Sequence, residues 1–181
     1  SFFETTYSSF VRMYYQRTFD AMIATPLLVE DVIAGELLWG ATKAFGAGTI
    51  MLGMLTAFDL PVWPSAFWVL PLAAVGGLLF SSIGIIVTAL SPKIEAFNLP
   101  VFLLIFPMFL FSGTFFPLEQ LPDLARQFAM VFPLTHVCSL IRGACLDLTP
   151  PLLVVHIVYV LLAVGALGWL AIKLMHRRLV K

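Results

Sequence analysis

Residues 111–147 read FSGTFFPLEQLPDLARQFAMVFPLTHVCSLIRGACLD and lie between two long apolar runs. In the first half of this stretch, apolar residues recur at helical spacing: Leu121, Leu124, Phe128 and Val131. That spacing predicts an amphipathic helix of about three turns, which Pro133 ends. Thr135 is placed to cap a second helix that runs through Leu146. Each helix has about 12 residues, whereas a membrane span needs about 20, so the pair at 119–146 is expected to dip into the membrane rather than cross it.

The composition indicates an integral membrane protein. Of the 181 residues, 61% are hydrophobic and 11% are charged, whereas a typical soluble domain has about 25% charged residues. The net charge is zero and no long basic run occurs, which argues against nucleic acid as a partner. The chain begins SFFETTY, without a methionine or a signal-peptide pattern, so we expect part of the N-terminus to be missing.

The apolar runs predict an all-α polytopic membrane protein with a single transmembrane domain over residues 1–181. Residues 1–15 are interpreted as the remnant of one span, because their aromatic residues and Arg12 suit the headgroup level. Four complete spans are expected after it, near 32–58, 67–90, 96–116 and 152–172. Small residues in the first two of these spans offer thin surfaces for helix contacts: Gly46, Gly48, Gly53, Gly76, Gly77, Ser81 and Gly84.

Basic residues predict the orientation of the spans. Four of them lie in the C-terminal tail: Lys173, Arg177, Arg178 and Lys181. The positive-inside rule therefore places the C-terminus in the cytoplasm. Counting back, the turn at Lys93 and the segment with Arg12 and Arg17 fall on the same side, whereas Arg126 and Arg142 fall on the far side. The pair of short helices is accordingly expected to face outward.

Three ionisable side chains fall within or near the predicted membrane region, where a charge needs a partner or water: Glu4, Glu36 and Lys43. Glu36 and Lys43 are about two helical turns apart and so share a face. Two interpretations stay open for them, a salt-linked structural face and the lining of a substrate pathway. His156, in the middle of the last span, is compatible with a proton relay or with a hydrogen-bonded packing role.

The sequence lacks the motifs of catalytic and metal sites. It contains no Gly-rich loop ending in Gly-Lys-Ser/Thr, no His-Glu-x-x-His and no Gly-x-Ser-x-Gly. His136, Cys138 and Cys145 suggest a metal or disulfide site, but cysteines seven residues apart on a helix lie about 10 Å apart, beyond disulfide reach. We interpret the cysteines as small apolar fillers and expect no metal site and no catalytic residues.

Four segments resemble the ABC-2 class of ABC transporter permeases. They are QRTFDAMIATPL at 16–27, GELLWGATKA at 35–44, LFSGTFFPLEQLP at 110–122 and FPLTHVCSLIRG at 132–143. Within the class, the chain resembles the NodJ-type permeases, which export lipo-oligosaccharides, ahead of the polysaccharide, lipopolysaccharide and drug exporters. The resemblance covers almost the whole chain. Its motifs are specific for the class and say little about the substrate.

The resemblance implies a type V exporter-like fold with six spans per subunit, of which the first and most of the second are missing here. It implies a cytoplasmic coupling helix at 17–26 and outward re-entrant helices at 119–146. The implied function is ATP-driven export of an amphipathic substrate (a lipo-oligosaccharide, lipid-linked glycan or hydrophobic drug) across the bacterial inner membrane. The implied partners are membrane lipid, a second permease copy as a homodimer, and a separate ABC ATPase that binds ATP and magnesium, with no cofactor in this chain.

The resemblance also implies roles for individual residues. The pattern at 17–26 predicts a short helix with one apolar face, which either docks on a protein or lies on lipid. The resemblance assigns that face to ATPase coupling through Arg17, Phe19, Asp20, Met22, Ile23, Thr25 and Pro26. Glu4, Glu36 and Lys43 become candidates for lining the pathway. The candidates for an outward gate are Phe115, Phe116, Pro117, Pro133, Thr135, His136 and Arg142.

Two other classes of function are alternatives to the exporter. An ion-gradient-driven secondary transporter would use Glu36 and Lys43 as its coupling pair, but such proteins usually carry an internal repeat, and none is evident. An intramembrane enzyme would use Glu36, His136 or His156 as acid–base groups. Those three residues are expected at different levels of the predicted topology, which argues against a shared catalytic site.

Overall fold

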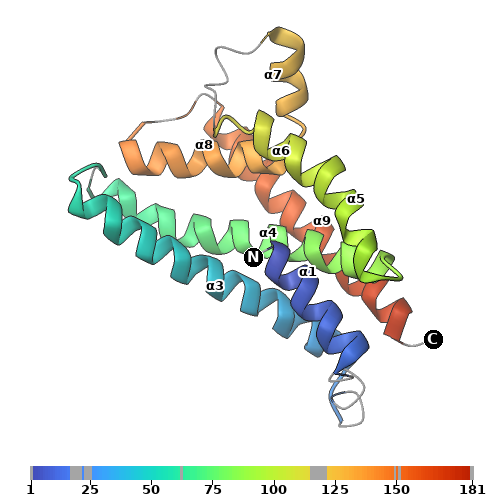
Figure 1. Cartoon of the computed structure of the whole chain (residues 1–181). Helices are drawn as coiled ribbons and strands as arrows, with labels where there is room; N and C mark the ends of the chain where they lie inside the picture. The colour runs from blue at the N-terminus through green and yellow to red at the C-terminus, as the bar shows by residue number, and fades with distance from the viewer. Residues whose placement is uncertain are drawn as a thin grey trace.

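A computed structural model describes residues 2–16, 22, 26–61, 63–114, 122–148, 150 and 152–179. This part of the chain is helical and contains no strand (Figure 1). The helices are α1 (Phe2–Phe10), α3 (Val29–Ala57), α4 (Val69–Leu90), α5 (Asn98–Pro100), α6 (Phe106–Phe111), α7 (Asp123–Ala129), α8 (Pro133–Leu146) and α9 (Leu153–Leu179). Two π-helical turns extend α1 and join α5 to α6, at Val11–Tyr15 and Val101–Ile105. Two 3-10 turns, Ser65–Trp68 and Ile94–Phe97, lead into α4 and α5.

Three helical segments of the described chain are long and apolar enough to cross a membrane. They are Ser65–Leu90, Ile94–Phe111 and Leu153–Leu179, which correspond to three of the four predicted spans. The fourth, α3, has 29 residues, and its glycines, threonines and charged residues keep it below the apolarity of the other three. The prediction of an all-α polytopic membrane protein is confirmed.

Helix α4 is the centre of the bundle and contacts α1, α3, α8 and α9. Its small residues permit close contacts, as predicted. A Cβ atom added to Gly77 would lie 2.5 Å from Ala44 Cβ on α3, and one added to Gly84 would lie 2.9 Å from Thr6 Oγ1 on α1. By contrast, a Cβ at Gly46 or Gly53 would meet nothing within 4 Å. The thin surface at those two glycines is therefore not used by any described helix.

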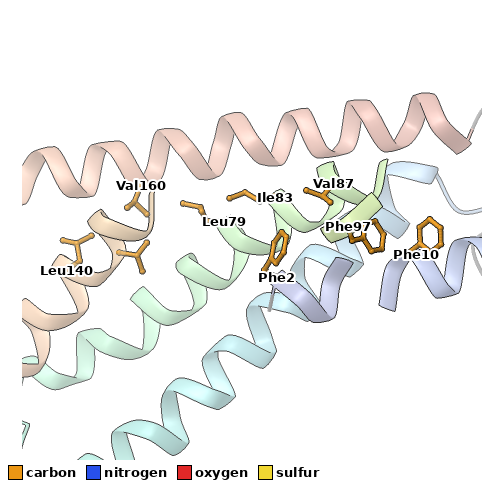
Figure 2. Packing of buried hydrophobic residues seen from close by; sticks show 9 residues of the cluster. Phe2, Phe10, Leu79, Ile83, Val87, Phe97, Leu140 and Val160 are labelled. Carbon is orange, nitrogen blue, oxygen red and sulfur yellow. The ribbon is translucent and has the colours of Figure 1, made fainter. Parts of the chain in front are cut away.

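Apolar side chains from the whole length of the chain meet along α4. One cluster joins α1, α4, α8, α9 and the 3-10 turn that ends at Phe97 (Figure 2): Phe2, Phe10, Leu79, Ile83, Val87, Phe97, Val137, Leu140 and Val160. A second cluster joins the first half of α3, the second half of α4 and the end of α9: Val29, Val32, Ile33, Leu37, Ile85, Ala171 and Met175. Because lipid is as apolar as these side chains, close packing rather than water exclusion holds such helices together in a membrane.

The two short helices differ in detail from the prediction. α7 has 7 residues and α8 has 14, so neither reaches the length of a span. Pro133 does not end the first helix. It is the first residue of α8, where its missing N–H costs nothing. The prediction that Thr135 caps α8 is wrong, because the helix starts two residues earlier, after Phe132, and has no side-chain cap.

α8 runs alongside the first half of α4 in the opposite direction. Near its start, Val137 lies against Gly76, whose added Cβ would be 3.2 Å from Val137 Cγ1. Near its end, Gly143 lines an apolar pocket together with Ser65 and Trp68, at the beginning of the α4 segment. α7 lies at the edge of the molecule, beyond α6 and α8 (Figure 1).

Candidate functional site

A buried carboxylate joins α1 to α3. Glu36 is 8% exposed, and Ser9 Oγ donates a hydrogen bond of 3.0 Å to its Oε2 atom. Arg12, on the π-helical turn that follows α1, forms an ion pair with its Oε1 atom. A buried charge is tolerated when it is both paired and hydrogen-bonded, and Glu36 has both kinds of partner. These contacts make Glu36 a structural link between α1 and α3.

A second ion pair joins the same two helices and is much more open. Lys43 Nζ binds Glu4 Oε1 and lies 4.9 Å from the centre of the Trp39 ring. The side chains of Lys43 and Glu4 are 36% and 48% exposed. Lys43 is the middle residue of α3, 14 residues from either end. The structure therefore holds a half-exposed ion pair at mid-height of a helix that is predicted to cross the membrane.

Glu36 and Lys43 share the face of α3 that meets α1, as their spacing predicts, but they do not pair with each other. Each binds a partner on the N-terminal segment. The pocket between the two ion pairs has a volume of only about 10 Å³. From the sequence, Arg12 is expected to be a headgroup anchor and Ser9 does not stand out. No local pattern relates either residue to Glu36, which lies 24 positions after Arg12 and 27 positions after Ser9.

Two histidines meet between α8 and α9. His136 Nδ1 lies 2.7 Å from His156 Nδ1, and both side chains are 3% exposed. The Nε2 atom of His136 lies 2.9 Å from the carbonyl oxygen of Met130 and must carry the hydrogen, since a carbonyl only accepts. In a neutral ring, His136 Nδ1 is then the acceptor and His156 Nδ1 is the donor.

This pair corrects one expectation, that His136 and His156 lie at different levels. They come together because α8 packs against the beginning of α9, where His156 lies in the first turn. His156 is indeed a hydrogen-bonded packing residue, one of the two roles left open for it. Glu36 stays apart from the pair, since its hydrogen-bond and ion-pair partners lie on α1 and the turn that follows it.

The turn between α7 and α8 is held through its backbone carbonyl groups. Thr135 Oγ1 donates to the carbonyl oxygen of Ala129 at 2.7 Å. Tyr159, on α9, stacks on the His136 ring with 4.0 Å between ring centres, and its hydroxyl donates to Val131 at 2.5 Å. Side chains of α8 and α9 thus satisfy carbonyl groups at the end of α7 and in the turn, and fix the turn to the bundle.

The other residues predicted at the outward gate are only partly described. Arg142 Nη2 donates to the carbonyl oxygen of Gly113 at 2.7 Å, and the φ of Gly113 is 80°, which favours glycine. This contact ties α8 to the end of α6. Phe115, Phe116 and Pro117 lie outside the described residues. Cys138 and Cys145 are both free thiols.

Most of the predicted coupling helix also lies outside the described residues: Arg17, Phe19, Asp20, Ile23 and Thr25. Pro26 is exposed. Met22 is half-buried and packs against the apolar cluster formed by α3 and α9. A contact of Met22 with the protein's own core was not foreseen, because the pattern at 17–26 defines an apolar face without saying what covers it.

Known proteins resemble this chain over most of its length. The model of the ABC-2 type transporter family matches residues 1–146. Nodulation protein J from Sinorhizobium fredii (strain NBRC 101917 / NGR234) is 37% identical over 177 residues, which cover 98% of this chain and 68% of that protein. Nodulation protein J from Neorhizobium galegae is 38% identical over 180 residues, which cover 99% of this chain and 68% of that protein.

Nodulation protein J from Rhizobium meliloti (strain 1021) is 40% identical over 167 residues, which cover 92% of this chain and 61% of that protein. No solved structure matches the chain. The resemblance seen in the sequence motifs is thereby confirmed, and the chain belongs to the family of ABC-2 type transporters.

Proposed function

We propose that this chain is the membrane-spanning subunit of an ATP-driven exporter in the bacterial inner membrane. A separate ABC ATPase binds ATP and magnesium, and two permease copies form the path for an amphipathic substrate. Membership of the ABC-2 family supports a transporter subunit rather than an enzyme. The similarity to nodulation protein J supports a lipo-oligosaccharide as the first substrate class to test.

The observation that carries the proposal is the open ion pair of Glu4 and Lys43. Lipid solvates charge poorly, so intramembrane ion pairs face protein or a water-filled cavity. Since this pair is half-exposed at mid-height of α3, the surface around it must meet something other than lipid tails. A polar translocation path along the α1–α3 face meets that need. We therefore assign Glu4 and Lys43 to the lining of the path and Glu36 to its structural support.

Labelling of introduced cysteines tests this assignment. In a full-length background with Cys138→Ala and Cys145→Ala, we expect a Lys43→Cys variant to react with a charged, membrane-impermeant thiol reagent in inverted or right-side-out vesicles. The matched control is Leu38→Cys, since Leu38 is 61% exposed and lies on a different face of the same helix. Equal and negligible labelling at both positions would show that lipid, not water, covers the pair.

ATPase coupling is tested at the predicted coupling helix. We expect Phe19→Asp to abolish copurification of the ATPase subunit while leaving membrane insertion intact, because a charge would face an apolar contact. Leu124→Asp is the control, since Leu124 is 83% exposed on α7 and is expected at the opposite side of the membrane. The coupling assignment is wrong if the ATPase still copurifies with the Phe19 variant.

The outward lid is the third part of the proposal. α7 and α8 are too short to cross the membrane and are fixed to α6 and α9 by Arg142, Tyr159 and the histidine pair. We assign them to the outer face, above the path.

The substrate class is identified by vanadate-sensitive ATPase activity of the reconstituted complex. This activity is measured with lipo-oligosaccharides, lipid-linked glycans and hydrophobic drugs. Absence of vanadate-sensitive activity with every class would argue against ATP-driven export.

The secondary-transporter alternative loses its main support. It required Glu36 and Lys43 to act as a coupling pair, whereas Glu36 binds Arg12 and Lys43 binds Glu4. No observation favours it over the exporter.

A further inference from the structure

A broad groove lies at the end of the bundle opposite to α8, between the last turns of α4 and α9. Its volume is about 590 Å³. Apolar side chains and two guanidinium groups line it: Ala89, Leu90, Pro92, Leu174, Arg177 and Arg178. Leu90 is 66% exposed. The groove thus combines an apolar wall with positive charge at one end of two membrane-spanning helices.

The outer face of α9 places this groove at the membrane–water boundary. Trp169, Lys173 and Arg177 follow one another at intervals of four residues and are all exposed, so they form one stripe on the helix. Lys173 Nζ lies 4.4 Å from the centre of the Trp169 ring. Trp is enriched where hydrocarbon gives way to headgroups, and Lys near a helix end extends toward that boundary. Arg177, one turn further, then lies at the level of the lipid phosphates.

The two arginines have different roles in the groove. Arg178 is fixed, since its Nη1 atom donates to the carbonyl oxygens of Thr88 and Ser91 at the end of α4. Arg177 is exposed, and none of the ion pairs in the described part of the chain involves it. Arg178 therefore gives the groove a rigid positive wall, and Arg177 provides a charge that a ligand can neutralise.

We propose that this groove binds one anionic phospholipid of the bilayer. The phosphate group contacts Arg177 beside the fixed Arg178, and an acyl chain lies along Leu90 and Leu174. Basic pockets between membrane helices at the headgroup level bind anionic lipid headgroups in this manner. The apolar wall favours a lipid over a free phosphate, which would leave it uncovered. The bound lipid would bridge the ends of α4 and α9, which Arg178 already joins.

Lipid competition with the full-length protein tests the proposal. We would measure displacement of a fluorescent phosphatidylglycerol from detergent-solubilised protein by unlabelled phosphatidylglycerol or phosphatidylcholine. We expect phosphatidylglycerol to compete and phosphatidylcholine not to compete. Arg177→Gln should weaken phosphatidylglycerol binding about fivefold, the effect of one basic residue near an anionic lipid. The control Lys173→Gln removes a charge from the same stripe but outside the groove, and binding should stay within about twofold.

Four results would overturn the proposal. Equal competition by phosphatidylcholine would mean that the groove does not select an anionic headgroup. An equal loss in the Lys173→Gln variant would mean that net charge, rather than a site, attracts the lipid. If Arg177→Gln leaves lipid binding unchanged but releases a copurifying protein subunit, the groove is a protein interface. Inorganic phosphate at the same concentration should not displace the fluorescent lipid, and displacement would point to a phosphate site instead.

Discussion

The two places where short segments attach to the bundle use different chemistry. α1 and the turn that follows it attach to α3 through two ion pairs, at Glu36 and at Lys43. The α7–α8 turn attaches to α9 through hydrogen bonds between neutral groups. These are the histidine pair, in the neutral arrangement given above, and a tyrosine bonded to a backbone carbonyl.

This difference predicts different mechanical behaviour. Removing one partner of a buried ion pair leaves an uncompensated charge and costs about 3–5 kcal/mol. Losing a hydrogen bond between neutral groups costs about 0.5–1.5 kcal/mol. The α1–α3 contact is therefore expected to stay closed during transport, whereas the α7–α8 turn can detach from α9 within the range of thermal and ligand-driven changes.

The largest effect is expected at Arg12. Arg12→Leu removes the ion-pair partner of buried Glu36, and we expect it to lower the free energy of unfolding by about 3 kcal/mol. Thermal unfolding of the full-length protein in detergent measures this loss. Arg126→Leu, on the exposed face of α7, should cause little change. Adding Glu36→Gln should restore part of the stability, and a Glu36→Gln/Arg12→Leu protein no more stable than Arg12→Leu alone would contradict the ion-pair explanation.

The next effect concerns the contact between α3 and α4. Gly77→Ala places a methyl group 2.5 Å from Ala44 Cβ and 3.0 Å from the Ala41 backbone, so the helices must separate. We expect a loss of about 2 kcal/mol from overpacking, measured by the same thermal unfolding. Gly53→Ala is the matched control on α3, because a methyl group there meets nothing within 4 Å. If both variants unfold alike, the close contact at Gly77 does not limit packing.

A smaller effect is expected at the histidine pair. His156→Phe leaves the Nδ1 atom of His136 without its donor, and we expect a loss of about 1 kcal/mol. The single variants His136→Phe and His156→Phe and the double variant form a cycle, whose coupling energy should also be about 1 kcal/mol. A coupling energy near zero would mean that the 2.7 Å contact adds nothing to stability. His176→Phe, with its ring nitrogen 3.9 Å from Glu30, serves as the control for a more exposed histidine.

The smallest effect is expected at Tyr159. Tyr159→Phe keeps the stacked ring and removes only the hydrogen bond to Val131. We expect a loss of about 0.5 kcal/mol, at the low end for a neutral hydrogen bond. Hydrogen exchange should speed up at residues 130–132 and stay unchanged at α1 and α3. Faster exchange throughout the protein would show that the turn does not open by itself.

The sequence predicts the helices better than the contacts between them. The long apolar runs are governed by local hydrophobicity, so three of them correspond to helices that can cross a membrane. The sequence predicts the start of α8 wrongly, because Pro133 fits both the end of one helix and the first turn of the next. That Pro133 is the first residue of α8 depends on how the preceding turn is held. The carbonyl oxygens of Ala129 and Val131 accept hydrogen bonds from side chains of α8 and α9.

The candidate site shows the same limit. The residue types Glu4, Glu36 and Lys43 stand out because charges are rare in apolar runs. Their partners could not be deduced, since Arg12 lies 24 residues before Glu36 and Glu4 lies 39 residues before Lys43. His136 and His156 are likewise 20 residues apart on different helices. A local pattern identifies a side chain that needs a partner, but only the tertiary fold selects which one.

Arg178 has a consequence for how the protein is made. Its guanidinium group donates hydrogen bonds to the carbonyl oxygens of Thr88 and Ser91 at the end of α4. These two residues lie 90 and 87 positions before Arg178 in the chain. During synthesis, α4 leaves the ribosome long before its cap does. The end of α4 can therefore become fully ordered only after the last helix of this chain has been made, which is a late event of membrane assembly. A released chain that stops before Arg178 would leave the end of α4 uncapped.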